Sequence, residues 1–317
     1  MDGCGFSAAT VCAVRSHYAK IFSLQELPET NPNITRAALV RHGLTADKTP
    51  SPLEKEGSLR RLMHEMKSVL VAYSGGVDSS YLALIANQEL GAGAVCVTGL
   101  SPSVSGHQRE EAAKIASEFD LTFITVDTDE VDNKEYQANG TNRCYFCKSE
   151  LYGKLGTIAR ERGLEFVIDG TNADDVGDHR PGRAAANEAG VRSPLVEAGL
   201  GKDEIRQLSR SHGLPTWDKP ASPCLASRVA HGVPVTIGRL KQVEDGEEFL
   251  RALGFREFRV RVHGETVRLE IAVDEIEKAF GKLAREAIAR EFRRLGFRYV
   301  TLDLEGFRTG SMNPVRT

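Results

Sequence analysis

The sequence predicts an α/β fold, in which helices cover a parallel sheet, followed by a smaller α+β domain. From residue 52 to about residue 220, short apolar runs alternate with amphipathic segments, a pattern typical of βαβ units and a parallel sheet. Beyond Pro234 this regular alternation stops. The chain has 317 residues, and single hydrophobic cores rarely grow past roughly 250. We therefore expect two domains, at 52–220 and 221–317.

Residues 1–51 are expected to form an N-terminal extension, to which the sequence assigns no role. They include Pro28, Pro32 and Pro50 and show no sustained hydrophobic period, which favours short helical pieces. The spacing of leucines and methionines predicts a helix over 52–66. The other elements expected in the first domain are strands at 68–73, 94–99, 122–127 and 166–169, and helices at 79–90, 106–119, 147–162 and 202–212.

The second domain is expected to begin with a cysteine-bearing linker and to continue as a small α+β unit. Its longest predicted element is a helix over 274–295, recognised by its extended amphipathic pattern. A helix at 237–253 precedes three predicted strands, at 257–262, 266–272 and 299–304.

Composition excludes several classes of protein. With 41% hydrophobic and 27% charged residues and a net charge of −3, the chain lacks the basic excess of a general nucleic-acid binder. No apolar run approaches the ~18 residues of a membrane-spanning helix. Six cysteines without a secretory signal pattern favour a reducing cytoplasm over a disulfide scaffold. We therefore expect a cytoplasmic protein with no membrane and no nucleic-acid partner.

A glycine-rich segment joins the first predicted strand to the next helix. Its backbone N–H groups and the helix N-terminus face one point, which predicts an anion site. Without Gly-Lys-Ser/Thr it is not the usual γ-phosphate loop, and a capped tight turn is the plain alternative. The Asp78 carboxylate suits Mg²⁺ or a role in orienting the loop. The segment predicted to bind ATP consists of Ser74, Gly75, Gly76, Val77, Asp78 and Ser79.

A second polar block follows the predicted strand at 166–169. Open α/β sheets bind their ligands at the carboxyl ends of strands, so this block and the Ser74 segment are expected to share one sheet edge. By itself the block is also compatible with an ordinary Asn/Asp/Gly-rich loop. The residues expected to complete the ATP site are Asp169, Gly170, Thr171 and Asp174.

The cysteines are unevenly spaced. Cys144 and Cys147 form a C-x-x-C pair before a predicted helix, and Cys224 follows the first domain. Three thiolates from two loops could hold three corners of a [4Fe–4S] cluster, or zinc with an open position. A redox pair or a coincidence is also compatible with the spacing. Cys4, Cys12 and Cys96 are interpreted as ordinary thiols.

Several motifs together resemble one known family. The S-G-G-x-D-S segment is that of the PP-loop ATP pyrophosphatases, which are adenine nucleotide alpha hydrolase-like proteins. The chain from residue 52 onward is similar to the LarE-type sulfur transferases of nickel-pincer nucleotide biosynthesis. The segments that carry this resemblance are 142–148, 169–175, 180–183, 192–195 and 215–220.

The resemblance implies an enzyme that uses ATP and Mg²⁺ and releases AMP and pyrophosphate. It implies a pyridinium-3,5-biscarboxylic acid mononucleotide substrate, whose carboxylates are adenylated and become thiocarboxylates for a cofactor of lactate racemase maturation. Some members sacrifice the cysteine at the position of Cys224. Members that also have the other two cysteines are thought to carry a [4Fe–4S] cluster, and Cys144 and Cys147 match that type. Sulfide or another sulfur donor and a homo-oligomer are implied as partners.

Two arginines alternate with apolar residues along the predicted strand at 257–262. Arg259 and Arg261 therefore share one face of the strand and could clamp a phosphate. By sequence alone, a solvated edge strand is the simpler interpretation of this pattern. The resemblance matches them, with Ser227 and Arg228, to the substrate-phosphate residues of the family. It also suggests Glu247 and Glu270 as tentative metal ligands.

Three alternatives stay open at this stage. An amide-forming PP-loop ligase of the NAD-synthetase or GMP-synthetase kind would need ammonia and no cysteines. A transfer-RNA thiolase would show salt-sensitive RNA binding. A non-catalytic nucleotide-binding iron–sulfur sensor would release no pyrophosphate.

Overall fold

The computed structural model describes residues 50–177 and 181–308, and these belong to one compact unit. Almost all of the expected N-terminal extension, with Cys4 and Cys12, lies outside the described residues. The boundary between residues 220 and 221 stays a prediction. Among the described residues, no helix is long and apolar enough to cross a membrane.

The first part of this unit contains a four-stranded parallel sheet, as predicted. The strands are β1 (Val69–Ala72), β2 (Ala94–Leu100), β3 (Phe123–Asp127) and β4 (Phe166–Asp169), in the order β3-β2-β1-β4. Strand β1 pairs with β2 on one side and with β4 on the other. The strand order therefore reverses between β1 and β4, and in open α/β sheets ligands bind at the carboxyl ends beside such a point.

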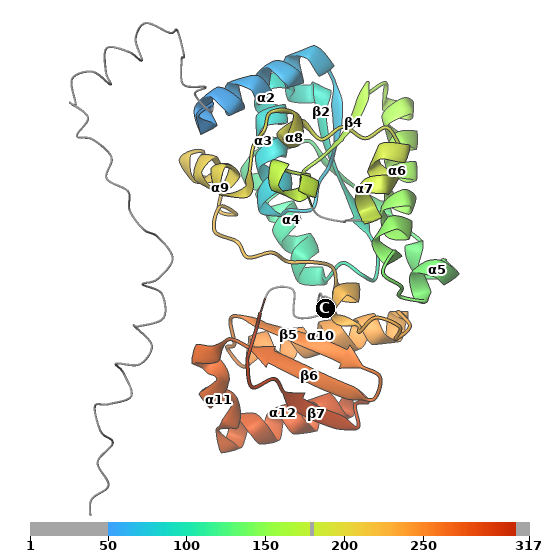
Figure 1. Ribbon diagram of the computed structural model, residues 1–317, viewed down its shortest axis with the longest axis vertical. Coiled ribbons are helices and arrows are strands. Elements are labelled where there is room, and N and C mark those ends of the chain that lie inside the picture. Colours follow the sequence, from blue (N-terminus) through green and yellow to red (C-terminus); the bar gives the residue numbers. More distant parts are fainter. Residues whose placement is uncertain (1–49, 178–180, 309–317) are drawn as a thin grey trace, which may run out of the picture. The chain divides into compact units, whose positions relative to one another are not determined.

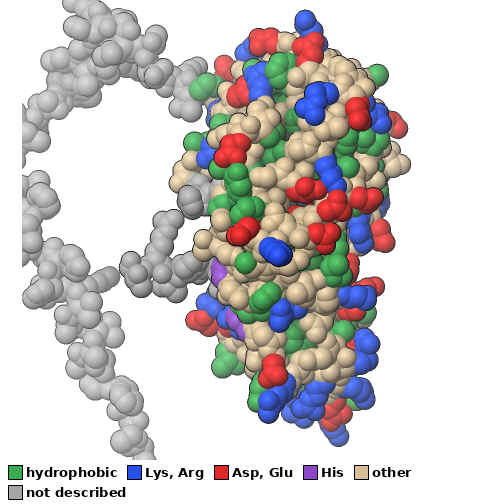
Figure 2. Space-filling view, turned by 90° about the vertical axis from the view of Figure 1, so that its right-hand side faces the viewer, with side chains coloured by type: hydrophobic (Ala, Val, Ile, Leu, Met, Phe, Trp, Pro, Cys, Tyr) green, Lys and Arg blue, Asp and Glu red, His purple; other side chains and the backbone are tan. Residues whose placement is uncertain are grey.

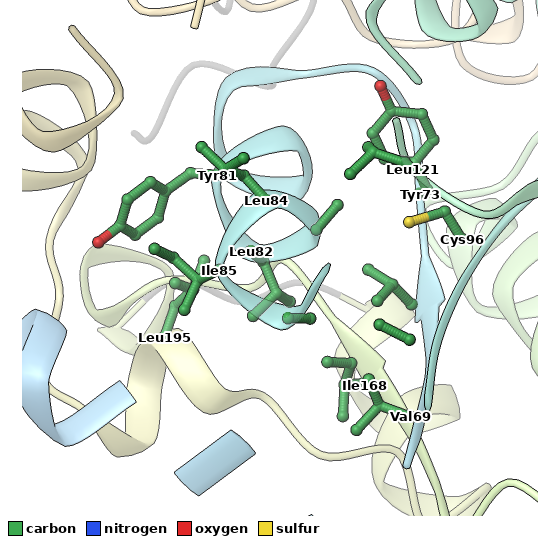
Figure 3. Close-up of a cluster of buried hydrophobic side chains, with 14 of the residues drawn as sticks. Val69, Tyr73, Tyr81, Leu82, Leu84, Ile85, Cys96, Leu121, Ile168 and Leu195 are labelled. Carbon is green, nitrogen blue, oxygen red and sulfur yellow. The ribbon is translucent and has the colours of Figure 1, made fainter. Parts of the chain in front are cut away.

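Helices cover both faces of the sheet (Figure 1). One face packs against α2 (Pro52–Met66), α3 (Val77–Leu90), α4 (Gly106–Glu118) and α9 (Lys202–Ser211), and the other against α6 (Arg143–Arg162) and α7 (Pro181–Glu188). Figure 3 shows the first of these cores, where Cys96 lies on β2 among buried apolar side chains. Cys96 is thus a buried thiol within the sheet. Short helices α5 (Lys134–Gln137) and α8 (Pro194–Glu197) complete this part, together with the 3₁₀ turns η1 (Gly91–Gly93), η2 (Glu130–Asp132) and η3 (Ala173–Gly177).

Local sequence signals place the ends of two helices. Ser51 and Glu54 form a capping box at the start of α2, and Ser105 and Gln108 form another at the start of α4. Each box satisfies backbone N–H groups that a helix start leaves without partners. These signals explain why the starts of both helices match the predicted positions.

The second part contains a smaller mixed sheet. Strands β5 (Phe258–His263) and β6 (Thr266–Ile271) are antiparallel, and β7 (Tyr299–Leu302) pairs with β6 in parallel. Helices α10 (Ile237–Ala252) and α12 (Lys282–Arg294) pack on this sheet and share a core separate from those of the parallel sheet. The turn η4 (Leu225–Arg228) precedes α10, and η5 (Val273–Glu275) follows β6.

Two predicted helices are wrong in their extent. The helix expected over 274–295 is divided into α11 (Ile276–Phe280) and α12, because Gly281 between them is extended (φ −52°, ψ 135°). Glycine has a low helix propensity, and here it starts a new helix. The helix expected from Cys147 begins at Arg143, so the C-x-x-C pair lies in the first turns of α6 and not in a loop.

Candidate active site

The segment predicted to bind phosphate lies at the carboxyl end of β1, where the strand order reverses. Gly75 has a positive φ of 67°, and a Cβ there would stand 2.8 Å from Ala112 Cα of α4. Only glycine fits this approach of the loop to α4. Gly76 is the N-cap of α3 and has no side chain that could cap the helix. The first N–H groups of α3 therefore have no side-chain cap and can bind an anion.

Two hydroxyls close the loop on itself. Ser74 Oγ and Ser79 Oγ lie 3.0 Å apart, and the Ser74 N–H donates to Ser79 Oγ over 3.2 Å. Ser79 is buried, while Ser74 is exposed. The loop is thus held in shape by its own side chains, with one hydroxyl open to solvent.

The second polar block touches this loop, as expected for one sheet edge. A Cβ on Gly170 would lie 2.9 Å from the Ser79 backbone nitrogen, so the two segments are in contact. Asp169 is buried, and its oxygens accept hydrogen bonds from Tyr152, Thr171 and Ser193. Because these donors occupy the carboxylate, its position suits holding the loop more than direct contact with a ligand.

Asp174 and the Thr171 hydroxyl also have protein partners. Asp174 Oδ2 accepts from the Lys202 N–H at 2.6 Å, at the start of α9. The Thr171 hydroxyl donates to Asp169 Oδ2 at 2.9 Å. Asp174 thus connects the loop after β4 to α9, and Thr171 makes a contact within that loop. Their contacts with ATP stay a prediction.

Two lysines reach the loop from distant parts of the sequence. Lys202 Nζ lies 2.5 Å from Asp78 Oδ2. Lys219 Nζ donates to the Gly75 carbonyl at 3.3 Å and pairs with Glu111 of α4 at 2.9 Å. Sequence reasoning missed both lysines as site residues, because nothing in their spacing relates them to the loop.

Asp78 therefore differs from an open magnesium ligand. One of its oxygens pairs with Lys202, and the other is buried with no hydrogen-bond partner among the described residues. A buried carboxylate oxygen without a partner is costly, at roughly 1–3 kcal/mol. This oxygen is the part of Asp78 that a cation could still use.

The three cysteines named from the sequence belong to one neighbourhood. Cys144 is exposed, and Cys147 lies one turn further along the same face of α6. Burial, together with the nearby Cys224 and Cys144, raises the pKa of the Cys147 thiol to about 12. Cys147 and Cys224 also pack against the same apolar core.

The cysteine side chains are not arranged as a metal-binding site. Among residues 50–177 and 181–308, no three Cys, His, Asp or Glu side chains are grouped closely enough to hold a metal ion. The donor type fits an iron–sulfur cluster. Burial is the main reason why the pKa of Cys147 is raised, and the neighbouring thiols add to it. Ligation would therefore require the thiol side chains to move together.

The predicted phosphate-binding arginines form a buried network beside Cys224. Arg228 pairs with Glu247 at 2.9 Å and donates to the carbonyls of Pro223 and Cys224. Arg261 pairs with Glu270 at 2.9 Å, and its Nη1 donates to the Ser227 carbonyl at 3.3 Å. The arginine pairs therefore hold the Cys224 turn onto the small sheet.

This pairing bears on the tentative metal role of the two glutamates, which stays a prediction. Glu247 and Glu270 are both buried, and each is engaged by arginine: Glu247 by Arg228, and Glu270 by Arg261 and Arg268. Carboxylates that neutralise buried guanidinium groups are poor candidates for cation ligands.

Arg259 differs from its neighbours because it has no carboxylate partner among the described residues. Its guanidinium donates to the carbonyls of Phe258 and Ala221 and lies 4.9 Å from the Phe307 ring centroid. Burial, together with the charges of Arg228 and Arg261, lowers its pKa to about 10. The cluster thus holds excess positive charge at Arg259, which favours an anion there.

Comparison with known proteins gives three informative similarities, although no protein-family model matches the chain. It is 44% identical to an uncharacterized protein of Synechocystis sp., over 82% of this chain and 97% of that protein. It is 34% identical to the pyridinium-3,5-bisthiocarboxylic acid mononucleotide synthase of Lactiplantibacillus plantarum, over 83% of this chain and 95% of that enzyme. A GMP synthase of Clostridium novyi is 28% identical, but only 48% of its length is covered.

Proposed function

The chain belongs to the LarE-type family of enzymes, within the PP-loop superfamily, and from this premise we propose that it converts carboxylates of pyridinium-3,5-biscarboxylic acid mononucleotide into thiocarboxylates. The product would serve the nickel-pincer nucleotide cofactor. One observation carries the proposal: the segment 216–224 has Lys219 on the phosphate loop and ends at Cys224 beside the other thiols. ATP activation and sulfur delivery would then occur at the two ends of one short segment.

The first half-reaction is adenylation. The loop from Ser74 to Ser79 and the N-terminus of α3 would hold the ATP phosphates through backbone N–H groups. A substrate carboxylate oxygen attacks the α-phosphorus, the bond to the bridging oxygen breaks, and pyrophosphate leaves with the electron pair. Lys202 and Lys219 would offset charge on the leaving group, and the free oxygen of Asp78 would help to hold Mg²⁺.

The second half-reaction replaces oxygen by sulfur. A sulfur nucleophile attacks the activated acyl carbon, a C–S bond forms, the C–O bond to the phosphate breaks, and AMP leaves with the electron pair. Tight backbone contacts at Arg228 would fix the Cys224 turn during this step. Positioned reactants contribute much of the rate in such transfers.

We further propose that Cys144, Cys147 and Cys224 hold a [4Fe–4S] cluster. Their shared neighbourhood and the thiol donor set support it, although the side chains must move to reach ligand positions. When bound, the cluster would present an iron to which an external sulfide could bind. The protein's part is to supply the three thiolates and to keep Cys147 partly buried.

Arg259 is proposed to bind the phosphate of the substrate. Its guanidinium has excess charge and no carboxylate partner within the described residues. Arg228, Arg261 and Ser227 would support it by shaping the turn beneath the phosphate. The homo-oligomer implied by the family stays a prediction.

The rival functions find less support. The similarity to a GMP synthase covers about half of that enzyme, and an amide-forming ligase has no need of three neighbouring cysteines. On the face seen in Figure 2, acidic and basic side chains are interspersed, unlike the continuous basic surface of many RNA-binding proteins. A purely nucleotide-sensing role predicts no release of pyrophosphate on addition of the mononucleotide, so an assay of that release separates it from the proposed function.

The test is an anaerobic assay with ATP, Mg²⁺, the pyridinium mononucleotide and either sulfide or ammonia. We expect pyrophosphate release that depends on the mononucleotide, and a thiocarboxylate product with sulfide only. Alanine at Cys144, Cys147 or Cys224 should abolish thiocarboxylate formation, whereas Cys96→Ala, in the buried sheet, should retain it. Full activity in all three site variants, or an amide product with ammonia, would contradict the proposal.

A further inference from the structure

A buried polar cluster lies next to the cysteines and has no part in the function argued so far. It consists of Ser101, Ser103, Glu130 and Tyr136, all nearly inaccessible to solvent. Ser101 Oγ and Ser103 Oγ lie 2.6 Å apart, and Ser103 Oγ donates to Glu130 Oε1 over 2.8 Å. Polar groups are costly to bury, so such a cluster calls for an explanation.

The cluster connects the two cysteine-bearing segments. The Leu225 N–H, directly after Cys224, donates to the Ser103 carbonyl over 2.8 Å. Tyr136 lies on α5, shortly before the α6 cysteines, and belongs to the core against which Cys147 and Cys224 pack. Glu130 lies close enough to Cys147 for their charges to interact. The polar cluster and the thiols therefore border the same buried region.

Two oxygen atoms of the cluster lack a partner. Glu130 Oε2 and the Tyr136 hydroxyl are both buried and make no hydrogen bond of normal length among the described residues, and the Ser103 hydroxyl lies near that of Tyr136. Glu130 is 3% exposed and Tyr136 is 1% exposed. In the described part of the chain, Glu130 also has no cationic partner among the ion pairs. Glu130 and Tyr136 lie close enough for their charges to interact, and one atom accepts while the other can donate, so together they suit a small molecule that does both.

We propose that Glu130 Oε2 and the Tyr136 hydroxyl form a binding site for hydrogen sulfide beside the cysteines. The inference rests on the proposed function and deepens it, because it names the form in which sulfur arrives. An S–H of the neutral molecule donates to Glu130, and its sulfur accepts from Tyr136. The buried carboxylate disfavours the hydrosulfide anion, since like charges repel strongly away from water.

The same oxygens would also suit a water molecule, and size and polarity alone do not separate the two ligands. Location favours sulfide, because a small molecule held there would lie next to Cys147 and Cys224. Water in the same place would have a purely structural role. The two possibilities predict different responses to added sulfide.

The experiment compares the full-length protein with Glu130→Gln and Tyr136→Phe under anaerobic conditions. The matched control is Glu135→Gln, at an exposed position on α5. We expect the sulfide concentration for half-maximal thiocarboxylate formation to rise at least about tenfold in both site variants, from the loss of one hydrogen bond to a charged or polar group. The rate of substrate-dependent pyrophosphate release should stay unchanged.

A second readout does not depend on activity. Without ATP or substrate, sulfide should raise the thermal midpoint of the unchanged protein and of the control, because a ligand that binds the folded state stabilises it. Both site variants should lose that rise. Unchanged sulfide dependence in both variants, in assay and melting, would overturn the inference and leave water as the ligand.

The two proposals fail in different ways. If the unchanged protein made no thiocarboxylate yet sulfide still raised its midpoint through Glu130 and Tyr136, the sulfur-transfer function would be wrong and the sulfide site would stand. Should Glu130→Gln not fold, Tyr136→Phe alone decides, because it removes a single oxygen and retains the ring.

Discussion

The phosphate loop and the arginine network beside Cys224 are built in different ways. In the loop, Ser74 and Ser79 are only 5 positions apart, and backbone groups supply the donors. In the network, Arg228 and Glu247 are 19 positions apart, and Arg261 reaches Ser227 across 34. The loop offers an anion site at little cost to folding, whereas the network holds buried charges that must balance one another. Substitutions in the network should therefore mainly lower stability, whereas substitutions in the loop should mainly weaken ligand binding.

The largest expected effect is on the arginine network. Glu247→Ala would leave the buried guanidinium of Arg228 without its carboxylate, which costs about 3–5 kcal/mol of unfolding free energy. Denaturant unfolding measures this loss. Glu248→Ala, at the exposed next position, is the control and should change stability by less than about 0.5 kcal/mol. Equal effects of the two substitutions would contradict a charge-balanced network.

The next effect is on the phosphate loop. Gly75→Ala would place a Cβ 2.8 Å from Ala112 Cα at a positive φ, with a backbone cost of about 1–2 kcal/mol. We expect ATP binding to weaken roughly tenfold or more, as measured by titration calorimetry. The control is Gly153→Ala within α6, where nothing crowds the added methyl. It should stabilise the fold by about 0.5–1 kcal/mol and leave ATP binding unchanged.

A smaller effect is expected from the segment that joins the two regions. Lys219→Ala removes a cation from Gly75 and Glu111, and we expect the KM for ATP to rise about fivefold to tenfold with little change in stability. Lys114→Ala provides the comparison, because Lys114 is exposed on α4, the helix of Glu111, and pairs there with Glu118. A change in stability without a change in KM would show that Lys219 serves the fold alone.

The smallest effect is confined to alkaline pH. Because the pKa of Cys147 is raised from its usual 9 to about 12, the folded state retains this proton more strongly than the unfolded chain. The resulting stability is fully present below pH 9 and is lost as pH rises from 9 towards 12. In iron-free protein, Cys147→Ala should flatten the decline of the thermal midpoint between pH 8 and pH 10. An equal flattening by Cys144→Ala, at an exposed thiol, would contradict this assignment.

Features set by neighbouring residues could be predicted from the sequence. The strand, the two glycines and the two serines of the phosphate loop act within one turn, so their pattern indicates their structure directly. The strands of the parallel sheet were predicted within a few residues for the same reason.

Features set by residues far apart in the chain could not be predicted from the sequence. Helix α6 begins at Arg143, whose buried guanidinium donates to Asn139 and to the Ala226 carbonyl. The contact with Ala226 spans 83 positions, so the local pattern predicted a later start. Lys202 and Lys219 reach the loop in the same way, through helix packing and a long connection. The pair of Glu270 with Arg261 likewise depends on the pairing of β5 with β6, and the pair of Glu247 with Arg228 depends on the contact of α10 with η4.

The most direct test of the account is mass spectrometry of both the product and the protein after turnover. Anaerobic protein should be supplied with ATP, Mg²⁺, the pyridinium mononucleotide and isotopically labelled sulfide. We expect labelled sulfur to replace carboxylate oxygen in the mononucleotide and the mass of the protein to be unchanged. Unlabelled sulfur in the product, together with loss of the mass of H₂S from Cys224, would contradict delivery of external sulfide. A product without sulfur would contradict the function itself.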